Sequence, residues 1–153
     1  MINEEASAHL ERCVTLAREA LEAGDDPFGS VLVDDSGQVL FEARNRVVIK
    51  DSTEHPELVL ARWAAANMTL KARAQATVYT SGEHCPMCAA AHAWAGLGRI
   101  VFISSSEQLS EWLVQFNAPA SPVRMHAVHS GDCARGGGRR AGDGACGRRK
   151  GIA

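Results

Sequence analysis

The sequence predicts an α/β protein with a single folded domain of about 130 residues, near the common domain size. The chain has 153 residues, 46% of them apolar and 22% charged, which is enough for one core and too little for two. Segments with helical spacing alternate with short strand-like runs. Helices between strands imply crossover connections, so we expect a mostly parallel sheet covered by helices, with a hairpin at one side.

The first elements are a helix and a β-hairpin. Residues 4–23 carry apolar side chains at intervals of three and four, and Gly24 follows as a stop signal. Two apolar runs, 30–33 and 39–43, flank a turn sequence at 34–37 whose glycine suits a positive φ. The pattern predicts a helix followed by two antiparallel strands.

The rest of the domain continues the alternation. We expect helices where apolar residues recur at helical spacing and strands in the short apolar runs between them. In chain order these are a helix at 56–68, a strand at 77–80, a helix at 86–97, a strand at 100–103, a helix at 107–116 and a strand at 123–128. The sheet is therefore expected to have five strands.

Residues 131–153 differ in composition from the rest. Almost all are Gly, Arg, Ala, Asp or Cys, and Ile152 is the one sizeable apolar side chain, so this segment cannot build a core. We predict a folded domain at 1–130 and a disordered, low-complexity Gly/Arg-rich tail at 131–153. An RNA-binding arm and a segment ordered by a partner subunit are the alternatives.

Charge also separates the body from the tail. The formal net charge is −2, but from Arg135 onward there are six basic residues and one acidic residue. Residues 1–134 therefore hold ten basic and seventeen acidic side chains, a balance of −7. Such a body repels polyanions, so we expect a small, nearly neutral ligand rather than a nucleic acid.

No segment has the features of a membrane span or an export signal. The chain has no run of about 18 apolar residues, and it opens with acidic residues where a secretory signal would be basic and then apolar. We therefore expect a cytoplasmic protein without a membrane partner. In that compartment the pair Cys85 and Cys88 favours metal or redox chemistry over a structural disulfide.

Two predicted helices begin with the same local design, His55-Pro56 in one and Cys85-Pro86 in the other. Proline is favoured at the first helical position and disfavours helical geometry in the residue before it, so His55 and Cys85 are expected at N-caps. Cys88 follows on the same side of the first turn, where the positive helix end lowers thiol pKa values.

The three side chains suit a zinc ion. Two thiolates and one imidazole leave one position of a tetrahedral zinc for water, as catalytic sites do. Glu57 can converge on the same point from the first turn after His55, and is a candidate general base and then general acid. A structural zinc whose fourth ligand is His84 or His92 is the alternative.

This combination resembles the cytidine deaminase superfamily of zinc deaminases, whose signature is H-x-E followed by C-x-x-C. Residues 55–57 and 85–88 carry that signature here. Residues 27–31 also resemble the P-x-G-A-V segment at the first strand. Two more segments, 45–46 (N-R) and 80–83 (T-x-x-E), resemble the branch of guanine deaminases, free-base cytosine deaminases and bacterial tRNA adenosine deaminases. The resemblance covers residues 5–130.

The resemblance implies a three-layer α/β/α fold whose mixed five-stranded sheet has an N-terminal hairpin and parallel last strands. It also implies Zn2+ as the cofactor, a small aminated heterocycle as the substrate and a homodimer. The implied site residues are the zinc ligands His55, Cys85 and Cys88, the catalytic Glu57, and the substrate contacts Asn45, which would hydrogen-bond the ring, and Phe28, which would pack on its face.

His84 departs from the family pattern, which has proline before the first cysteine. Its imidazole could contact the substrate, occupy the fourth position on zinc or cap the end of the strand. We include His84 among the candidate substrate-binding residues.

We expect a zinc-dependent hydrolytic deaminase that converts an amino group of a heterocycle such as cytosine, isocytosine, guanine or an amino-triazine to a carbonyl and releases ammonia. Attack of hydroxide on the ring carbon gives a tetrahedral amine whose nitrogen must be protonated to leave, and one carboxylate can serve both steps. A tRNA adenosine deaminase is the first alternative, and it requires a basic surface with aromatic residues. A non-catalytic binding protein with a structural zinc is the second.

Overall fold

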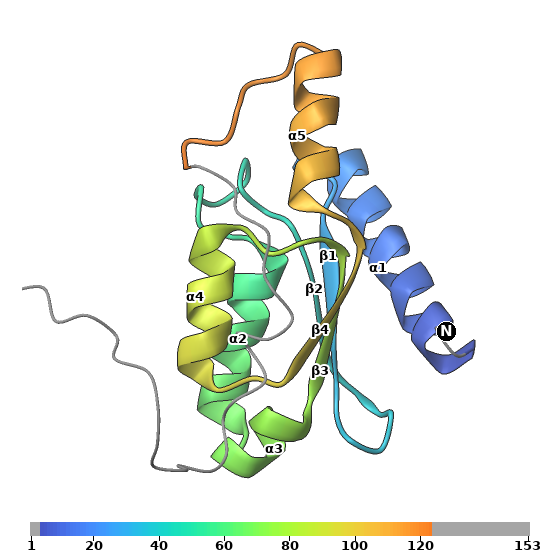
Figure 1. Cartoon of the computed structure of the whole chain (residues 1–153), viewed down its shortest axis with the longest axis vertical. Helices are drawn as coiled ribbons and strands as arrows, with labels where there is room; N and C mark the ends of the chain where they lie inside the picture. Colours follow the sequence, from blue (N-terminus) through green and yellow to red (C-terminus); the bar gives the residue numbers. More distant parts are fainter. Residues whose placement is uncertain (1–3, 124–153) are drawn as a thin grey trace, which may run out of the picture.

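A computed structural model describes residues 4–123 (Figure 1). Its elements are α1 (Glu4–Glu22), β1 (Gly29–Val33), β2 (Val39–Arg44), α2 (Pro56–Asn67), α3 (Leu70–Gln75), β3 (Thr77–Gly82), α4 (Pro86–Ala95), β4 (Arg99–Ser104) and α5 (Ser106–Gln115). The expected helices and the first four expected strands are confirmed, with ends that differ by one or two residues. The expected strand at 123–128 lies outside the described residues except for Val123, which is in no strand, and so does the tail at 131–153.

The short helix α3 was not predicted from the sequence. It has six residues, fewer than two turns, so it shows no helical period that a pattern could reveal. Its signal is local, because Thr69 at the N-cap accepts a hydrogen bond from the backbone N–H of Ala72 through its side chain. A threonine cap of this kind is a recognised helix start.

The four described strands form a mixed sheet in the order β2-β1-β3-β4. β1 pairs antiparallel with both β2 and β3, whereas β3 and β4 are parallel. The mostly parallel sheet expected from the alternation is therefore wrong for these strands. Helices do connect strands that run in one direction, β2 to β3 and β3 to β4, but β1 runs the opposite way and lies between β2 and β3.

The sheet is the middle of three layers (Figure 1). α1 covers one face, and α2 and α4 lie side by side over the other, as expected for an α/β/α fold. α5 extends beyond the sheet from the end of β4. None of the helices in residues 4–123 has the length and apolar character needed to cross a bilayer.

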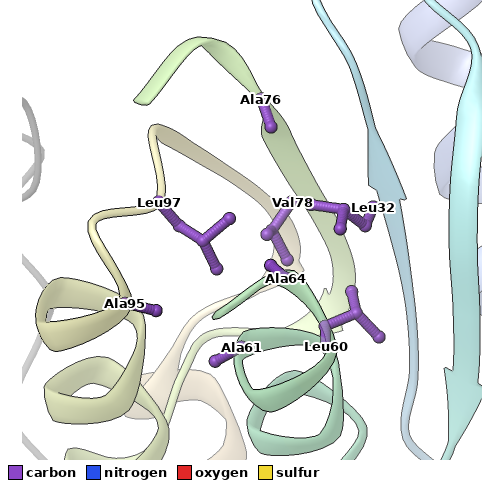
Figure 2. Close-up of a cluster of buried hydrophobic side chains, with 8 residues drawn as sticks. All are labelled: Leu32, Leu60, Ala61, Ala64, Ala76, Val78, Ala95 and Leu97. Atoms are coloured by element: carbon purple, nitrogen blue, oxygen red, sulfur yellow. The ribbon is translucent and has the colours of Figure 1, made fainter. Parts of the chain in front are cut away.

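The larger hydrophobic cluster fills the space between the sheet and the α2–α4 layer (Figure 2). Its buried members are Leu32, Leu60, Ala61, Ala64, Ala76, Val78, Ala95 and Leu97. Three of them are alanines on α2 and α4, and α2 packs directly on β1 and β2 while α4 packs on α2. A smaller cluster of Cys13, Leu16, Val31 and Val33 joins the sheet to α1, so alternate residues of β1 point into different clusters.

The topology brings several loops to one end of the sheet. β2 and β3 run in the same direction, so their carboxyl ends lie at the same end. The loop after β2 leads into α2, the loop after β3 leads into α4, and the antiparallel β1 begins there. Ligands of open α/β sheets bind outside the carboxyl ends of strands, and the predicted site residues come from these segments.

Candidate metal centre and active site

His55 and Cys85 are the N-cap residues of α2 and α4. Both have extended backbones, with φ −75° and ψ 139° at His55 and φ −68° and ψ 165° at Cys85, and each is followed by a proline in the first turn. Neither side chain makes a capping hydrogen bond to its helix. The imidazole and the thiol are therefore available to face each other in front of the two helix starts.

The two helix starts bring three donor atoms together. Cys85 Sγ lies 3.6 Å from His55 Nδ1 and 3.5 Å from Cys88 Sγ, and the three donors lie within 4.8 Å of one another. A tetrahedral zinc with bonds of about 2.3 Å to sulfur and about 2.1 Å to nitrogen separates such donors by about 3.6–3.8 Å. The group thus fits zinc, and within residues 4–123 it includes no fourth donor.

The two thiols differ in how readily they lose a proton. The hydrogen bond between the two thiols lowers the pKa of Cys85, burial opposes this effect, and the hydrogen bond with His55 adds to the lowering. The pKa of Cys88 is raised by its hydrogen bond with Cys85 and by burial. Cys85 is therefore the first thiolate to form, and a bound divalent cation deprotonates coordinating thiols.

Glu57 lies beside the three donors. Its side chain is buried, Oε2 accepts a hydrogen bond from the Cys88 thiol at 3.7 Å, and Oε1 accepts one from the Thr80 hydroxyl at 3.0 Å. Burial raises the pKa of Glu57, and the hydrogen bond from Thr80 is among the influences that oppose this. A carboxyl group with a raised pKa can hold a proton between two transfers.

The loops before β1 and after β2 position Phe28 and Asn45. The backbone N–H of Asn45 donates to the carbonyl of Phe28 at 2.9 Å, and its side-chain carbonyl accepts from the N–H of Val47 at 3.0 Å. The amide NH2 is thus the part of Asn45 that can serve a ligand. The Phe28 ring lies over Gly82, where an added Cβ would be 3.0 Å from Cε1, so the absence of a side chain at Gly82 makes room for the ring.

His84 lies against His92 and is fully buried. The ring centroids are 5.2 Å apart in an edge-to-face arrangement, and neither nitrogen of His84 has a hydrogen-bond partner among residues 4–123. Burial, and to a lesser extent His92, lowers the pKa of His84 to about 3, so the ring is neutral. Neither histidine belongs to the donor group, which removes the support for a structural zinc with one of them as fourth ligand. A contact between His84 and substrate stays a prediction.

Asp25 supports the site, and sequence reasoning missed it. Its carboxylate accepts from the N–H groups of Val48 and Ile49, at 2.9 and 3.2 Å, and pairs with Arg44 at 3.2 Å. Burial by itself would raise the pKa of Asp25, but these partners outweigh it and the pKa is lowered. Asp25 therefore holds the loop that follows Asn45, and no local pattern distinguishes it from the neighbouring Asp26.

Ser30 and Thr80 were also missed as site residues. Both are fully buried, and the Ser30 hydroxyl donates to Thr80 Oγ1 at 2.9 Å. The available signal was a hydroxyl residue in each of two buried strands, on the face where Leu32 and Val78 are apolar. Glu83, in the same T-x-x-E segment, has an evident structural role, because its carboxylate accepts from the N–H of Ser106 at 2.7 Å and ties the end of β3 to the start of α5.

Comparison with known proteins places this geometry in a family. Residues 3–104 match the cytidine and deoxycytidylate deaminase zinc-binding region, a stretch that contains all three donors and Glu57. A probable cytosine deaminase from Schizosaccharomyces pombe is 32% identical over 129 residues, which cover 82% of this chain and 76% of the relative. The segment resemblance seen in the sequence is thus confirmed over most of the domain.

Other relatives have different printed activities. Guanine deaminase from Bacillus subtilis is 41% identical over 88 residues, 56% of each chain. The X-ray structure of a guanine deaminase from Bacillus subtilis superimposes with a TM-score of 0.60 at 30% identity, covering 84% of this chain and 88% of that one. A tRNA-specific adenosine deaminase from Haemophilus influenzae is 35% identical over 91 residues, 59% of this chain and 53% of the relative. These relatives share the deamination reaction and differ in the heterocycle.

Proposed function

Since the chain belongs to the cytidine and deoxycytidylate deaminase zinc-binding family, we propose that it is a hydrolytic deaminase of a small nucleobase-like heterocycle. Cytosine, isocytosine, guanine and amino-triazines are the substrate class, water is the co-substrate, and the products are the ring carbonyl and ammonia. The observation that carries the proposal is the buried Glu57 carboxylate, whose Oε2 lies 3.7 Å from Cys88 Sγ at the edge of the three-donor group.

The proposed chemistry divides between the cation and one carboxylate. Zinc held by His55, Cys85 and Cys88 supplies a Lewis acid that lowers the pKa of water to roughly 7. Glu57 takes a proton from the attacking water and returns a proton to the amino nitrogen, which leaves as ammonia. The carboxylate is regenerated, so the net reaction consumes one water and replaces an amino group by an oxygen.

Three residues are proposed to hold the ring. Phe28 packs on its face, because its aromatic ring stands at the start of β1 at the same end of the sheet as the donor group. Asn45 donates its amide N–H to a ring acceptor, since its side-chain carbonyl is already bonded to Val47. His84 directly precedes the zinc ligand Cys85, and we keep it as a candidate substrate contact.

A tRNA substrate is the second candidate, because tRNA-specific adenosine deaminases are among the relatives. Binding a polyanion requires a basic groove around the pocket. Residues 1–134 carry a net charge of −7, and the loop at 45–55 beside the site holds two basic and two acidic residues. The charge of the body therefore favours a small base.

We also propose a homodimer. α5 and its C-cap leave large apolar side chains exposed, including Trp112 at 44% in the helix and Phe116 at 73% at the cap. Burying such side chains is favourable, and a second copy of the chain is the partner that resemblance to the family implies. Light scattering after size-exclusion chromatography should give twice the chain mass at micromolar concentration, and a monomer there would contradict this part of the proposal.

The direct test is an ammonia-release screen of the zinc-loaded protein. The panel should contain free bases, the matching nucleosides, amino-triazines and an unmodified transfer RNA, with Glu57→Gln as the inactive control. We expect release from at least one free base or triazine. Release from transfer RNA alone would favour the second candidate, and no release from any compound would indicate a non-catalytic binding protein.

A further inference from the structure

The face of the sheet that α2 covers changes character toward the site. Leu32 and Val78 are opposite each other across β1 and β3, and both belong to the hydrophobic cluster. The next pair on that face is Ser30 and Thr80, and each side chain is fully buried. A buried hydroxyl costs free energy unless it is hydrogen-bonded, so a polar pair next to an apolar one needs a reason.

The hydroxyls of Ser30 and Thr80 form a chain of hydrogen bonds that ends at Glu57. The Ser30 hydroxyl donates to Thr80 Oγ1 at 2.9 Å, and the Thr80 hydroxyl donates to Glu57 Oε1 at 3.0 Å. Thr80 has a single hydroxyl proton, and its other acceptor, the Gly29 carbonyl, is farther away at 3.4 Å. A carboxylate is the stronger acceptor, so the proton goes to Glu57, and donation from Ser30 strengthens that bond by polarising the Thr80 hydroxyl.

The two oxygens of Glu57 therefore have different surroundings. Oε1 points to the strand hydroxyls, and Oε2 points to Cys88 Sγ in the donor group. A glutamate side chain has three rotatable bonds, and a proton shuttle works efficiently only when its reactive oxygen is held within hydrogen-bond reach of both the donor and the acceptor of the proton. A bond that immobilises one oxygen restricts where the other can be.

We propose that Ser30 and Thr80 form a hydroxyl relay that anchors Glu57 through Oε1 and so aims Oε2 at the reacting atoms. The proposal rests on the proposed role of Glu57 as proton shuttle. Ser30 and Thr80 are positioning residues, because they touch Glu57 and act through it. Ser30 stands where the P-x-G-A-V segment that this chain resembles has alanine, so the outer member of the relay departs from that pattern.

Kinetics of four variants test the relay. Thr80→Val keeps the shape of the side chain and removes the donor, so kcat should fall roughly ten- to a hundredfold, as expected for loss of a hydrogen bond to a charged group, with KM nearly unchanged. Thr80→Ser restores the hydroxyl and should restore most of kcat. Ser30→Ala should lower kcat less, and should have no further effect when combined with Thr80→Val, because the relay is then already broken.

Ser104→Ala is the matched control. It removes a half-buried hydroxyl from the neighbouring strand, where Ser104 donates to the Ser81 carbonyl at 2.9 Å, and should leave kcat unchanged. The relay is wrong if Thr80→Val retains normal kcat, if Thr80→Ser is as slow as Thr80→Val, or if the effects of Ser30→Ala and Thr80→Val are additive. Equal zinc content in all variants should accompany the expected result.

A measurement without substrate separates this proposal from the proposed function. In the zinc-loaded protein the Thr80 hydroxyl proton should give a slowly exchanging NMR signal that shifts in Glu57→Gln and in Ser30→Ala and stays in place in Ser104→Ala. If the wild type deaminates nothing but shows this pattern, the proposed function fails and the relay stands as a structural contact to Glu57. The relay is overturned if the Thr80 hydroxyl signal is absent, or if its chemical shift is the same in wild type, Glu57→Gln and Ser30→Ala.

Discussion

The helices α2, α3, α4 and α5 begin in two different ways. α3 and α5 begin at Thr69 and Ser105, whose side-chain oxygens accept from the backbone N–H groups of Ala72 and Gln108, both at 3.2 Å. α2 and α4 begin at His55 and Cys85, which make no such bond. An oxygen cap contributes about 1 kcal/mol to stability. α2 and α4 lack this stabilisation, because the side chains of their N-cap residues, His55 and Cys85, face the metal centre instead.

The two donor-bearing starts also differ from each other. α4 contributes two thiols, Cys85 and Cys88, and behind them the neutral His84. α2 contributes one imidazole and, two residues later, the buried carboxylate of Glu57. The start of α4 therefore serves mainly to hold a cation, and the start of α2 combines holding the cation with moving a proton. Substitutions at the start of α4 and at the start of α2 should therefore impair different properties of the protein.

The largest effect is expected at the start of α4. Cys88→Ser removes a buried thiolate ligand, so the protein should lose most of its zinc and all detectable turnover, and should melt at a lower temperature. Metal analysis by mass spectrometry after dialysis, with ammonia release measured in parallel, checks this. Cys13→Ala is the control, because Cys13 is buried in the cluster beneath α1, away from the donors, and should keep stoichiometric zinc. Full zinc content in Cys88→Ser would refute the assignment of the ligand.

At the start of α2 the expected defect is chemical. Glu57→Gln should retain zinc and melting temperature and lower kcat by about 10²–10⁴-fold, the usual worth of a general acid–base group. Glu54→Gln is a nearby control, since the half-buried Glu54 carboxylate pairs with Lys50 at 3.3 Å and is not one of the three donors, so this variant should keep normal activity. Unchanged turnover in Glu57→Gln would show that another group moves the proton.

His84 should make the start of α4 sensitive to acid. The pKa of His84 is lowered to about 3 in the folded protein from an ordinary value of 6.5. Between pH 3 and pH 6.5, His84 is therefore protonated in the unfolded chain and neutral in the folded chain. Stability is therefore full above pH 6.5 and is lost as pH falls through this window, by about 2 kcal/mol at pH 5. Urea unfolding of wild type and His84→Leu between pH 8 and pH 5 should show that the free energy of unfolding falls more steeply with decreasing pH in wild type. Parallel curves would mean that His84 is protonated in the fold.

The smallest effect is expected at a helix start without donors. Ser105→Ala breaks the capping box of α5, in which Ser105 and Gln108 bond each other's backbone N–H groups. It should cost about 1 kcal/mol of unfolding free energy and leave zinc content and kcat as they are. Chemical denaturation and the ammonia assay check both parts. A loss of zinc in this variant would show that α5 and the metal centre are coupled, and would weaken the contrast between the two kinds of start.

With the exception of the short helix α3, the sequence was sufficient for the features that local rules determine. Proline after His55 and after Cys85 placed both residues at helix starts, and the three-residue spacing of Cys88 placed it on the same side of the first turn. The same kind of reasoning located the hairpin, whose Gly37 has φ +87°. These features depend on the backbone preferences of a few neighbouring residues, which can be read from the residue types alone.

Apart from α3, the features that escaped prediction depend on contacts between distant segments. The place of β1 between β2 and β3 follows from pairing choices that the alternation of helices and strands does not determine. The bonds from Asp25 to the loop after Asn45, and from Thr80 to Glu57, join residues more than twenty positions apart. Asp25, Ser30 and Thr80 are common residue types, so only the assembled fold reveals what they support.

The central claim is one zinc with three protein donors and one free position beside Glu57. X-ray absorption at the zinc edge of the protein in solution tests it most directly, because sulfur and nitrogen or oxygen neighbours give separate shells. We expect two sulfur neighbours at about 2.3 Å and two lighter neighbours at about 2.0–2.1 Å, of which a single imidazole is detectable by its outer-shell scattering. A shell with two imidazoles or three sulfurs, or a protein that binds no zinc, would contradict it.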